Sequence, residues 1–388
     1  MTITAPKGFR AAGIKAGIKA SGNPDLALVV NDGPSKAAAA VFTSNRVAAA
    51  PVHWSRQVVS DGRVDAVVLN SGGANACTGP QGFQNTHATA EKVAEVLGVS
   101  ASDVVVCSTG LIGEQLPMDK ILPGVEAAFG ELSDDGGSAA ATAIMTTDSV
   151  SKEAVFTGTD AEGKQFTVGG IAKGAGMLAP GLATMLVVLT TDAQVPADEL
   201  DVVLRDATRV TFDRADSDGC MSTNDTVVLL SSGASEALPS TEKLGEGITQ
   251  VCAELARKLI GDAEGASHDI AIRTFNAASE RDAEIVSRAV ARSNLFKAAI
   301  FGKDPNWGRV LSAVGTTDAV FEADQLNVAM NGVQICRNGA IGDDRDLVDL
   351  EPREVLVEID LSAGDAEATI WTNDLTHDYV HENSAYSS

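Results

Sequence analysis

One threonine of the chain stands where a side-chain hydroxyl could break a peptide bond. In the stretch MLAPGLATMLVVLTTDA (177–193), Thr184 follows a Pro-Gly turn and opens the apolar run 185–189. A threonine hydroxyl is a poor nucleophile until a base takes its proton. Attack of this hydroxyl on the Ala183 carbonyl would cut the bond between Ala183 and Thr184. The cut would free an α-amine with a pKa of about 7.7–8.0, which could serve as the base. The alternative is a plain turn threonine.

The segment just before this stretch is rich in glycine and carries one cation. Lys173-Gly174-Ala175-Gly176 lacks the GxxxxGK[ST] order of a nucleotide-binding loop, and no strand–GxGxxG–helix unit replaces it. We therefore favour a loop whose backbone amides approach a small anionic substrate, with Lys173 supplying the charge.

Other routes to catalysis are poorly supported by the sequence. His377 and His381 are four residues apart, a spacing that can bind a metal, but beyond the adjacent Glu382 there is no obvious third ligand. A solvated role is favoured, and no metal is predicted. The five cysteines form no CxxC pair, and no GxSxG elbow or Ser-His triad is recognisable.

The composition limits the class of protein. At 388 residues the chain is long enough for two lobes, and 44% hydrophobic with 21% charged residues is typical of a globular protein. A net charge of −24 argues against a nucleic-acid partner. Apolar runs are too short for a membrane helix, and the first residues lack a secretory pattern, so a cytoplasmic location without membrane contact is expected.

Strands and helices alternate along the sequence, which predicts an α+β fold of mixed αβ layers. Short apolar runs that end in Gly, Ser, Thr or Asn predict strands at 26–30, 64–69, 104–107, 185–189, 226–230, 268–274, 326–331 and 354–361. Helical spacing of apolar residues is found at 86–97, 118–129, 246–259 and 277–292.

Several segments together resemble one enzyme family. KGAGMLAPGLATMLVVLTTDA (173–193) is similar to the self-cleavage motif of the ornithine acetyltransferase family, the glutamate N-acetyltransferases of arginine biosynthesis. The resemblance extends, in family order, to NSGGANACTGPQG (70–82), STGLIGEQLP (108–117), AIMTTDS (143–149), STNDT (222–226), DAEGA (262–266), KDPNWGR (303–309) and DLTHDYVHENSAYSS (374–388). Gly73 departs from the family pattern, which usually has Asn there.

The resemblance implies a fold and a processing step. The fold would be that of the ornithine acetyltransferase and β-aminopeptidase-like superfamily, a self-cleaving N-terminal-nucleophile type. Cleavage between Ala183 and Thr184 would give an N-terminal chain, 1–183, and a C-terminal chain, 184–388, that stay together. A heterotetramer with two copies of each chain is expected for such a family.

The resemblance also implies roles for individual residues. Thr184 would be the nucleophile, and Thr109 with Gly110 would form the oxyanion hole. The expected substrate-binding residues are Thr147, Lys173, Thr184, Glu264, Asn383 and Ser388. Thr146 stands beside Thr147, and the sequence does not decide between them.

The expected reaction is a ping-pong acetyl transfer. N2-acetylornithine would give its acetyl group to Thr184, and glutamate would take it, with no cofactor. Some members of the family also use acetyl-CoA as a co-substrate, and the sequence does not settle this point. Two rivals stay open, a self-processed aminopeptidase-like hydrolase of the same superfamily and an uncut relative that only binds an amino acid.

Overall fold

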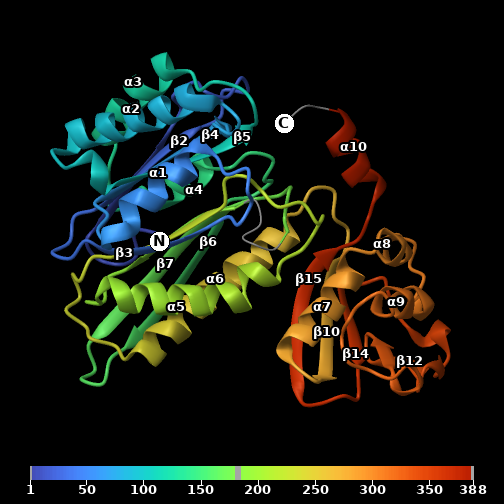
Figure 1. Cartoon of the computed structure of the whole chain (residues 1–388). Helices are drawn as coiled ribbons and strands as arrows, with labels where there is room; N and C mark the ends of the chain where they lie inside the picture. Colours follow the sequence, from blue (N-terminus) through green and yellow to red (C-terminus); the bar gives the residue numbers. More distant parts are fainter. Residues whose placement is uncertain (1, 180–184, 386–388) are drawn as a thin grey trace.

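The computed structural model describes residues 2–179 and 185–385, which form two lobes (Figure 1). A layered lobe contains two stacked sheets, and a smaller C-terminal lobe contains the third sheet. The boundary lies between the helix that ends at Gly261 and the strand that begins at Asp269. It therefore does not coincide with the predicted cleavage position.

The first sheet of the layered lobe has the strand order β1-β2-β4-β5. Its strands are β1 (Phe9–Ile14), β2 (Leu26–Asn31), β4 (Ala66–Gly73) and β5 (Val104–Leu111). Its outer face packs on α2 (Gly79–Leu97) and α3 (Met118–Gly130). Gly98, in the left-handed conformation, ends α2, and Pro80 occupies its first turn. α1 (Ala50–Val58) packs beside β5 and continues into the short helix η1 (Val59–Asp61).

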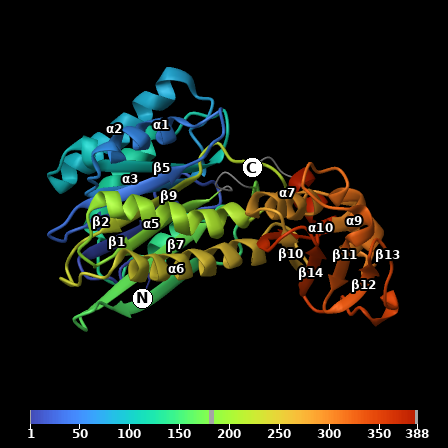
Figure 2. The same ribbon diagram turned by 60° about the horizontal axis from the view of Figure 1, so that its bottom comes forward.

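The second sheet has the order β3-β9-β8-β7-β6. Its strands are β3 (Ala37–Phe42), β6 (Lys152–Thr159), β7 (Gln165–Lys173), β8 (Leu186–Thr191) and β9 (Thr226–Ser231). The neighbours β8 and β9 are parallel and buried along their whole length, which explains their unbroken apolar sequences. α5 (Ala197–Val210) and α6 (Thr241–Gly261) lie side by side on the outer face (Figure 2).

The inner faces of these two sheets share one apolar core. Val29 and Leu69 of the first sheet belong to the same buried cluster as Val188 and Val228 of the second. α4 (Gly137–Ala143) closes this core beside β1 and β2. The lobe is thus built of helix, sheet, sheet and helix layers, which confirms the predicted class of mixed αβ layers.

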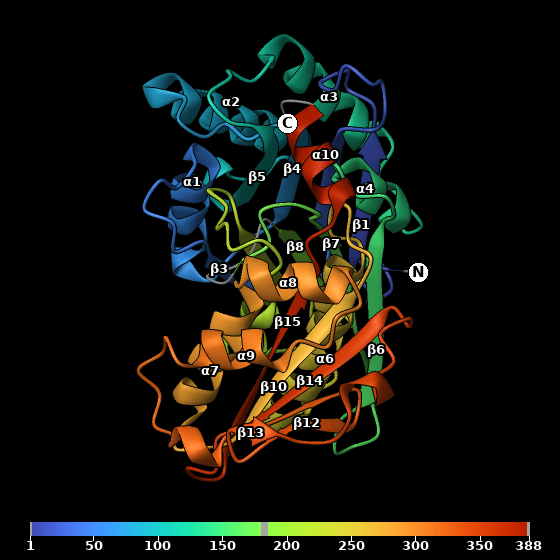
Figure 3. The ribbon, with the colours of Figure 1, turned by 90° about the vertical axis from the view of Figure 1, so that its right-hand side faces the viewer.

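The C-terminal lobe has the strand order β13-β12-β11-β14-β10-β15. Its strands are β10 (Asp269–Ala277), β11 (Asn327–Met330), β12 (Val333–Arg337), β13 (Ala340–Ile341), β14 (Glu354–Asp360) and β15 (Ala366–Asn373). Its helices are α7 (Glu280–Ala291), α8 (Asn294–Phe301) and α9 (Trp307–Val314), and all three contribute buried apolar residues to the core of the sheet. The chain then leaves the lobe as α10 (His377–Ala385), which points back toward the layered lobe (Figure 3).

The predicted elements agree with this structure. Each predicted strand and helix corresponds to a strand or helix of the same type, but α2 begins seven residues and α6 five residues before the predicted start. Short 3-10 turns occur besides η1, at Ala101–Asp103, Phe212–Arg214, Ala323–Gln325 and Arg345–Leu347. Among the described residues, no helix combines the length and apolar character needed to cross a bilayer.

Candidate active site

A cavity of about 210 Å³ brings together residues that are far apart in the sequence. It lies where β5 and β7 end and where the loop before β9 meets the start of the C-terminal lobe. Its lining includes Thr109, Gly110, Thr147, Lys173, Glu264 and Asn383, which are the described residues that the sequence predicted for oxyanion or substrate binding. Thr146 also lines the cavity, so the geometry does not separate it from Thr147.

The end of β5 can be built only with glycine at position 110. Gly110 has a φ of +128°, and a Cβ there would lie 2.6 Å from the carbonyl carbon of Gly72 and from the nitrogen of Gly73. β4 and β5 are parallel, and the pairing shifts at Gly73. This irregular strand end places Thr109 and Gly110 at the cavity.

Two buried amides fix the loops around this strand end. Asn224 Nδ2 donates to the carbonyls of Ala74, at 2.6 Å, and Ser108, at 2.8 Å. Asn70 Nδ2 donates to the carbonyl of Gly73 at 3.0 Å, and Asn70 Oδ1 accepts from the Ser108 hydroxyl at 2.6 Å. The backbone that carries Thr109 is therefore held from both neighbouring segments.

Gly73, which departs from the family pattern, packs beside the cavity wall. A Cβ at this position would lie 2.8 Å from Leu116 Cδ2. An asparagine here would require the Leu116 side chain to move. The adjacent Ala74 is the residue that lines the cavity.

Lys173 ends β7 and is almost fully buried, with 2% of its surface exposed. Its Nζ donates to Thr109 Oγ1 at 3.3 Å and lies 3.9 Å from Asp148 Oδ2. Burial lowers the pKa of Lys173, and Asp148 opposes this effect. The ammonium therefore connects the predicted oxyanion hole to a buried carboxylate.

Asp148 is the centre of a buried charge network that the sequence analysis missed. Asp148 Oδ1 accepts from Lys152 Nζ and from the Gly174 N–H, both at 2.6 Å, and Oδ2 accepts from the Thr146 N–H at 2.9 Å. Lys152 Nζ also donates to Asp262 at 2.5 Å. Burial alone would raise the pKa of Asp148, but Lys173, Lys152 and these hydrogen bonds outweigh it and lower the pKa to about 2.

Glu264 forms the opposite wall of the cavity. Its backbone N–H donates to the Ala175 carbonyl at 3.0 Å, and its Oε2 accepts from Asn383 Nδ2 at 3.0 Å. A Cβ at Gly176 would lie within 2.7–2.8 Å of the Glu264 carboxyl group, so glycine at 176 makes room for this carboxylate. The bond to Asn383 connects α10 to the cavity.

The predicted nucleophile and its neighbour lie outside the described residues, as does Ser388. The structure therefore assigns no geometry to Ala183, Thr184 or Ser388. The chain is described again from Met185, whose N–H donates to Asp225 Oδ1 at 3.0 Å. Leu186 pairs with Lys173 in the ladder between β8 and β7. β8 thus begins beside the residue that reaches Thr109.

Asp225 is a second buried acid that the sequence analysis did not single out. Its side chain has no exposed surface, and burial raises its pKa well above the usual value despite the Met185 N–H and the nearby Lys173. Asp148, Asn224 and Asp225 all lie in quoted motifs. Their roles were missed because a sequence does not show which polar residues are buried.

The two C-terminal histidines do not face a common ligand. His377 packs edge-on against the Phe301 ring, with centroids 5.4 Å apart, and His381 is exposed on α10. Within residues 2–179 and 185–385, no group of three or more His, Cys, Asp or Glu side chains is placed to hold a metal ion.

Residues 10–388 match the ArgJ family. The chain belongs to this family. A Streptomyces coelicolor protein named arginine biosynthesis bifunctional protein ArgJ is 67% identical over 388 residues, which cover 100% of both chains. The Mycobacterium tuberculosis protein of the same name is 53% identical over 393 residues, which cover 100% of this chain and 96% of its own.

A solved structure of an ArgJ-family relative is also similar in part. The ornithine acetyltransferase from Mycobacterium tuberculosis, complexed with ornithine, is 57% identical over 48% of this chain and 96% of the solved chain, with a TM-score of 0.44. Family membership confirms the family and the class of enzyme that the motifs predicted. The roles of individual residues and the cleavage stay predictions.

Proposed function

We propose that the protein is an acetyltransferase of arginine biosynthesis that moves the acetyl group of N2-acetylornithine to glutamate through an acetyl-Thr184 intermediate. The observation that carries the proposal is the cavity in which Thr109, Gly110, Lys173, Glu264 and Asn383 meet. Family membership supports the same reaction. Because its relatives are named bifunctional, acetyl-CoA is proposed as a second acetyl donor for glutamate.

The first step is self-cleavage. Thr184 Oγ attacks the Ala183 carbonyl carbon, the C–N bond breaks, and the proton moves to the nitrogen, which leaves an ester. Water then hydrolyses the ester, which leaves a carboxylate on Ala183 and restores the Thr184 hydroxyl beside the amine that the shift has freed. This amine is the general base for the hydroxyl of its own residue in every later turnover.

Acetyl transfer then needs a charge-stabilising site for the acetyl oxygen. Thr109 and Gly110 line the cavity, and in the proposed mechanism the Gly110 N–H and the Thr109 hydroxyl donate to that oxygen as it becomes negative. Lys173 Nζ donates to Thr109 Oγ1, so the Thr109 hydroxyl proton is not used in that bond and can be donated to the acetyl oxygen. The nearby ammonium also makes the Thr109 hydroxyl a stronger donor. Losing one such donor costs about 3–4 kcal/mol of transition-state stabilisation.

The charged walls of the cavity suit amino-acid substrates. The Glu264 carboxylate binds the ammonium group of ornithine, with Asn383 holding the carboxylate in place. Lys173 attracts the carboxylate end, and Thr147 or Thr146 adds a neutral hydrogen bond. We also propose that Ser388 contacts substrate, that no metal or other cofactor takes part, and that the enzyme works in the cytoplasm.

The intact mass of the denatured protein tests the cleavage. The wild type should give two species, residues 1–183 and 184–388, which together weigh one water more than the uncut chain. Thr184→Ala should stay whole and inactive, whereas the matched variant Thr184→Ser keeps a hydroxyl and should still split. Splitting of Thr184→Ala at this bond would disprove the acyl shift.

Product analysis distinguishes acetyl transfer from hydrolysis. Acetylornithine supplied with glutamate should yield N-acetylglutamate, and omission of glutamate should slow ornithine release strongly. Equal rates of ornithine release with and without glutamate would favour the aminopeptidase-like hydrolase. Replacing acetylornithine by acetyl-CoA in the same assay tests the second donor.

A further inference from the structure

The loop before β9 joins the two stacked sheets at the catalytic cavity through two adjacent side chains. Asn224 bonds the carbonyl of Ala74, which follows β4, and that of Ser108 in β5, so it holds the first sheet. Asp225 accepts the N–H of Met185, which directly precedes β8 of the second sheet. Neighbouring residues of one loop therefore fix a strand end of each sheet relative to the other.

Met185 is bonded to this loop through both polar groups of its backbone. Its N–H donates to Asp225 Oδ1 at 3.0 Å, and its carbonyl accepts from the Thr226 N–H at 3.1 Å. The Met185 side chain is buried in the core beneath α5 and α6. The Met185 nitrogen belongs to the planar peptide group that links this residue to Thr184. Asp225 thus bonds the peptide group next to the predicted nucleophile.

The Asp225 carboxyl group is buried and uses only one of its oxygens in this way. The side chain has no exposed surface, and Oδ2 has no hydrogen-bond partner among the described residues. Burial raises the pKa of Asp225 well above its usual value. The Met185 N–H, the nearby Ser222 hydroxyl and Lys173 on β7 oppose this rise, and Asp213 adds to it. Since an ionised carboxylate with a bare oxygen is costly to bury, Asp225 carries its proton.

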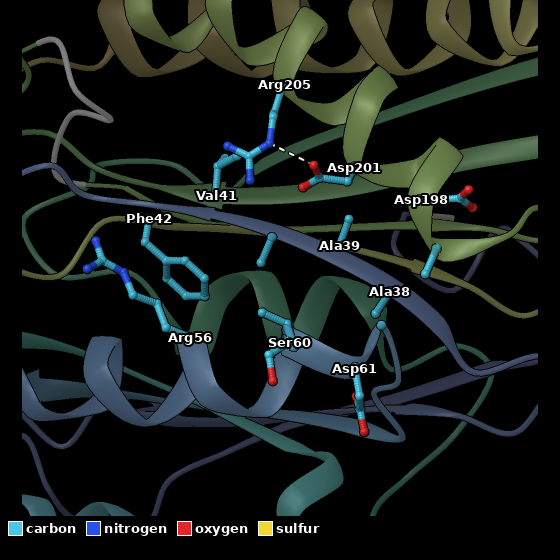
Figure 4. A pocket seen from close by; sticks show the side chains of 14 residues that line it. Ala38, Ala39, Val41, Phe42, Arg56, Ser60, Asp61, Asp198, Asp201 and Arg205 are labelled. Atoms are coloured by element: carbon cyan, nitrogen blue, oxygen red, sulfur yellow. Dashed lines mark hydrogen bonds and ion pairs between the residues drawn. The ribbon is translucent and has the colours of Figure 1, made fainter.

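The backbone of Asp225 is held independently of its side chain. Figure 4 shows the groove beside β3, where the Arg56 guanidinium lies over the Phe42 ring at the end of this strand. Arg56 Nη2 donates to the Thr43 carbonyl at 2.6 Å, and the Thr43 N–H donates to the Asp225 carbonyl at 2.9 Å. A shorter side chain at position 225 should therefore leave the loop in place.

We propose that Asp225 is a positioning residue for Thr184, which holds the Thr184–Met185 peptide group during self-cleavage and during turnover. This role rests on the proposed function, in which Thr184 is the nucleophile. The neutral state of Asp225 suits the role. The α-amine of Thr184 must lose its extra proton to act as a base, and an ionised carboxylate nearby would stabilise the ammonium form. A neutral carboxyl group holds the backbone without this effect.

The time course of self-cleavage is the first test. Intact mass, followed from the start of cell-free synthesis, gives the fraction of the chain that is cut before Thr184. Asp225→Ala should slow the cut about 100-fold, because a small misplacement of a reacting group carries a loss of this order. Asp225→Asn keeps an oxygen that accepts the Met185 N–H and should cut at nearly the wild-type rate. An Asp225→Asn protein as slow as Asp225→Ala would overturn the assignment.

Asp192 provides the matched control, because it follows β8 as Met185 precedes it. Asp192 is 3% exposed, and its carboxylate accepts from the N–H groups of Lys7 and Thr167, at 3.0 and 2.8 Å. Asp192→Ala should lower stability as Asp225→Ala does but leave the rate of the cut unchanged. If Asp192→Ala slows the cut as much as Asp225→Ala, the effect of Asp225 is one of stability alone and the proposal fails.

Steady-state kinetics tests the role in turnover, after prolonged incubation has completed the cut. Asp225→Ala should lower kcat per cut protomer and leave KM for acetylornithine at the wild-type value, because Asp225 does not line the cavity. The acid limb of the pH profile of kcat/KM should be the same in Asp225→Asn as in the wild type. A limb that moves to lower pH by about one unit in Asp225→Asn would overturn the neutral state of Asp225.

The wild type distinguishes failure of this role from failure of the proposed function. A wild type that stays whole would refute both. A wild type that splits and transfers acetyl, beside an Asp225→Ala protein that does both equally well, would refute the role of Asp225 alone.

Discussion

The layered lobe and the C-terminal lobe bury their polar residues in different places. At the cavity end of its sheets the layered lobe buries Lys152, Lys173, Asp148 and Asp225. In the C-terminal lobe the cluster between sheet and helices is apolar, and buried charges such as Lys297 lie at the junction with the layered lobe. Because an unpaired buried charge costs several kcal/mol, Asp148 is buried against two lysines, with Lys152 Nζ at 2.6 Å and Lys173 Nζ at 3.9 Å.

Among changes that test this difference between the lobes, Asp148→Asn should have the largest effect on stability and activity. Lys152 and Lys173 would keep their charges with no carboxylate between them, and the free energy of unfolding should fall by about 3–5 kcal/mol. Denaturant unfolding measures this change, and acetyl transfer should be lost as well. Asp262→Asn is the matched control. Since Lys152 keeps Asp148 there, the loss should be much smaller.

A change in the apolar C-terminal core should alter stability without altering chemistry. Ile272, on β10, has no exposed surface, and Ile272→Ala should lower the free energy of unfolding by about 2–5 kcal/mol. The catalytic rate per folded molecule should stay at the wild-type value, as measured by active-site titration and steady-state kinetics. A tenfold loss of rate would show that the two lobes are coupled.

Two buried amides, one in each lobe, allow a closer comparison. Asn224→Ala leaves the carbonyls of Ala74 and Ser108 without their donor, and Asn373→Ala does the same for Ile260 and His268. Each should cost about 1–3 kcal/mol of stability. Only Asn224→Ala should also lower kcat, because it alone supports the backbone that carries Thr109. Equal loss of kcat in both variants would contradict this assignment.

The smallest effect is expected from pH, with opposite signs for the two buried acids. Folding lowers the pKa of Asp148 to about 2, so its contribution to stability is present above pH 3.8 and is lost as pH falls toward 2. Burial raises the pKa of Asp225, so its contribution is complete below pH 3.8 and is lost as pH rises. Relative to the wild type, Asp225→Asn should therefore become more stable with rising pH, as measured by denaturant unfolding from pH 4 to 8.

Sequence patterns predicted the elements well and their assembly less well. The apolar runs at 104–107 and 226–230 indicated β5 and β9, because short strands bounded by turn residues leave a clear signal. Nothing in either run shows that the two strands belong to different sheets. Which strands pair depends on contacts between distant residues, and hydrophobic periodicity carries no information about them.

The sequence predicted those residues of the candidate site that the family motifs identify, but not the buried ion pair beside them. Six of its lining residues came from a family resemblance, whereas the ion pair of Asp148 and Lys152 has the spacing of an ordinary surface pair on a helix. Only the structure shows both side chains without exposed surface. Burial decides the energetic weight of such a pair, and a single sequence does not report burial.

The order β3-β9-β8-β7-β6 places strands from both sides of position 184 in one sheet. A cut between β7 and β8 would therefore yield two fragments that share this sheet. To dissociate, they would have to break six residue pairs between β7 and β8 and six between β3 and β9. Neither fragment could form the sheet alone. Renaturation of the nicked protein would follow second-order kinetics and slow on dilution, whereas the uncut precursor would fold at a rate independent of concentration. Synthesis as one polypeptide would thus let the shared sheet form before any cut at this position.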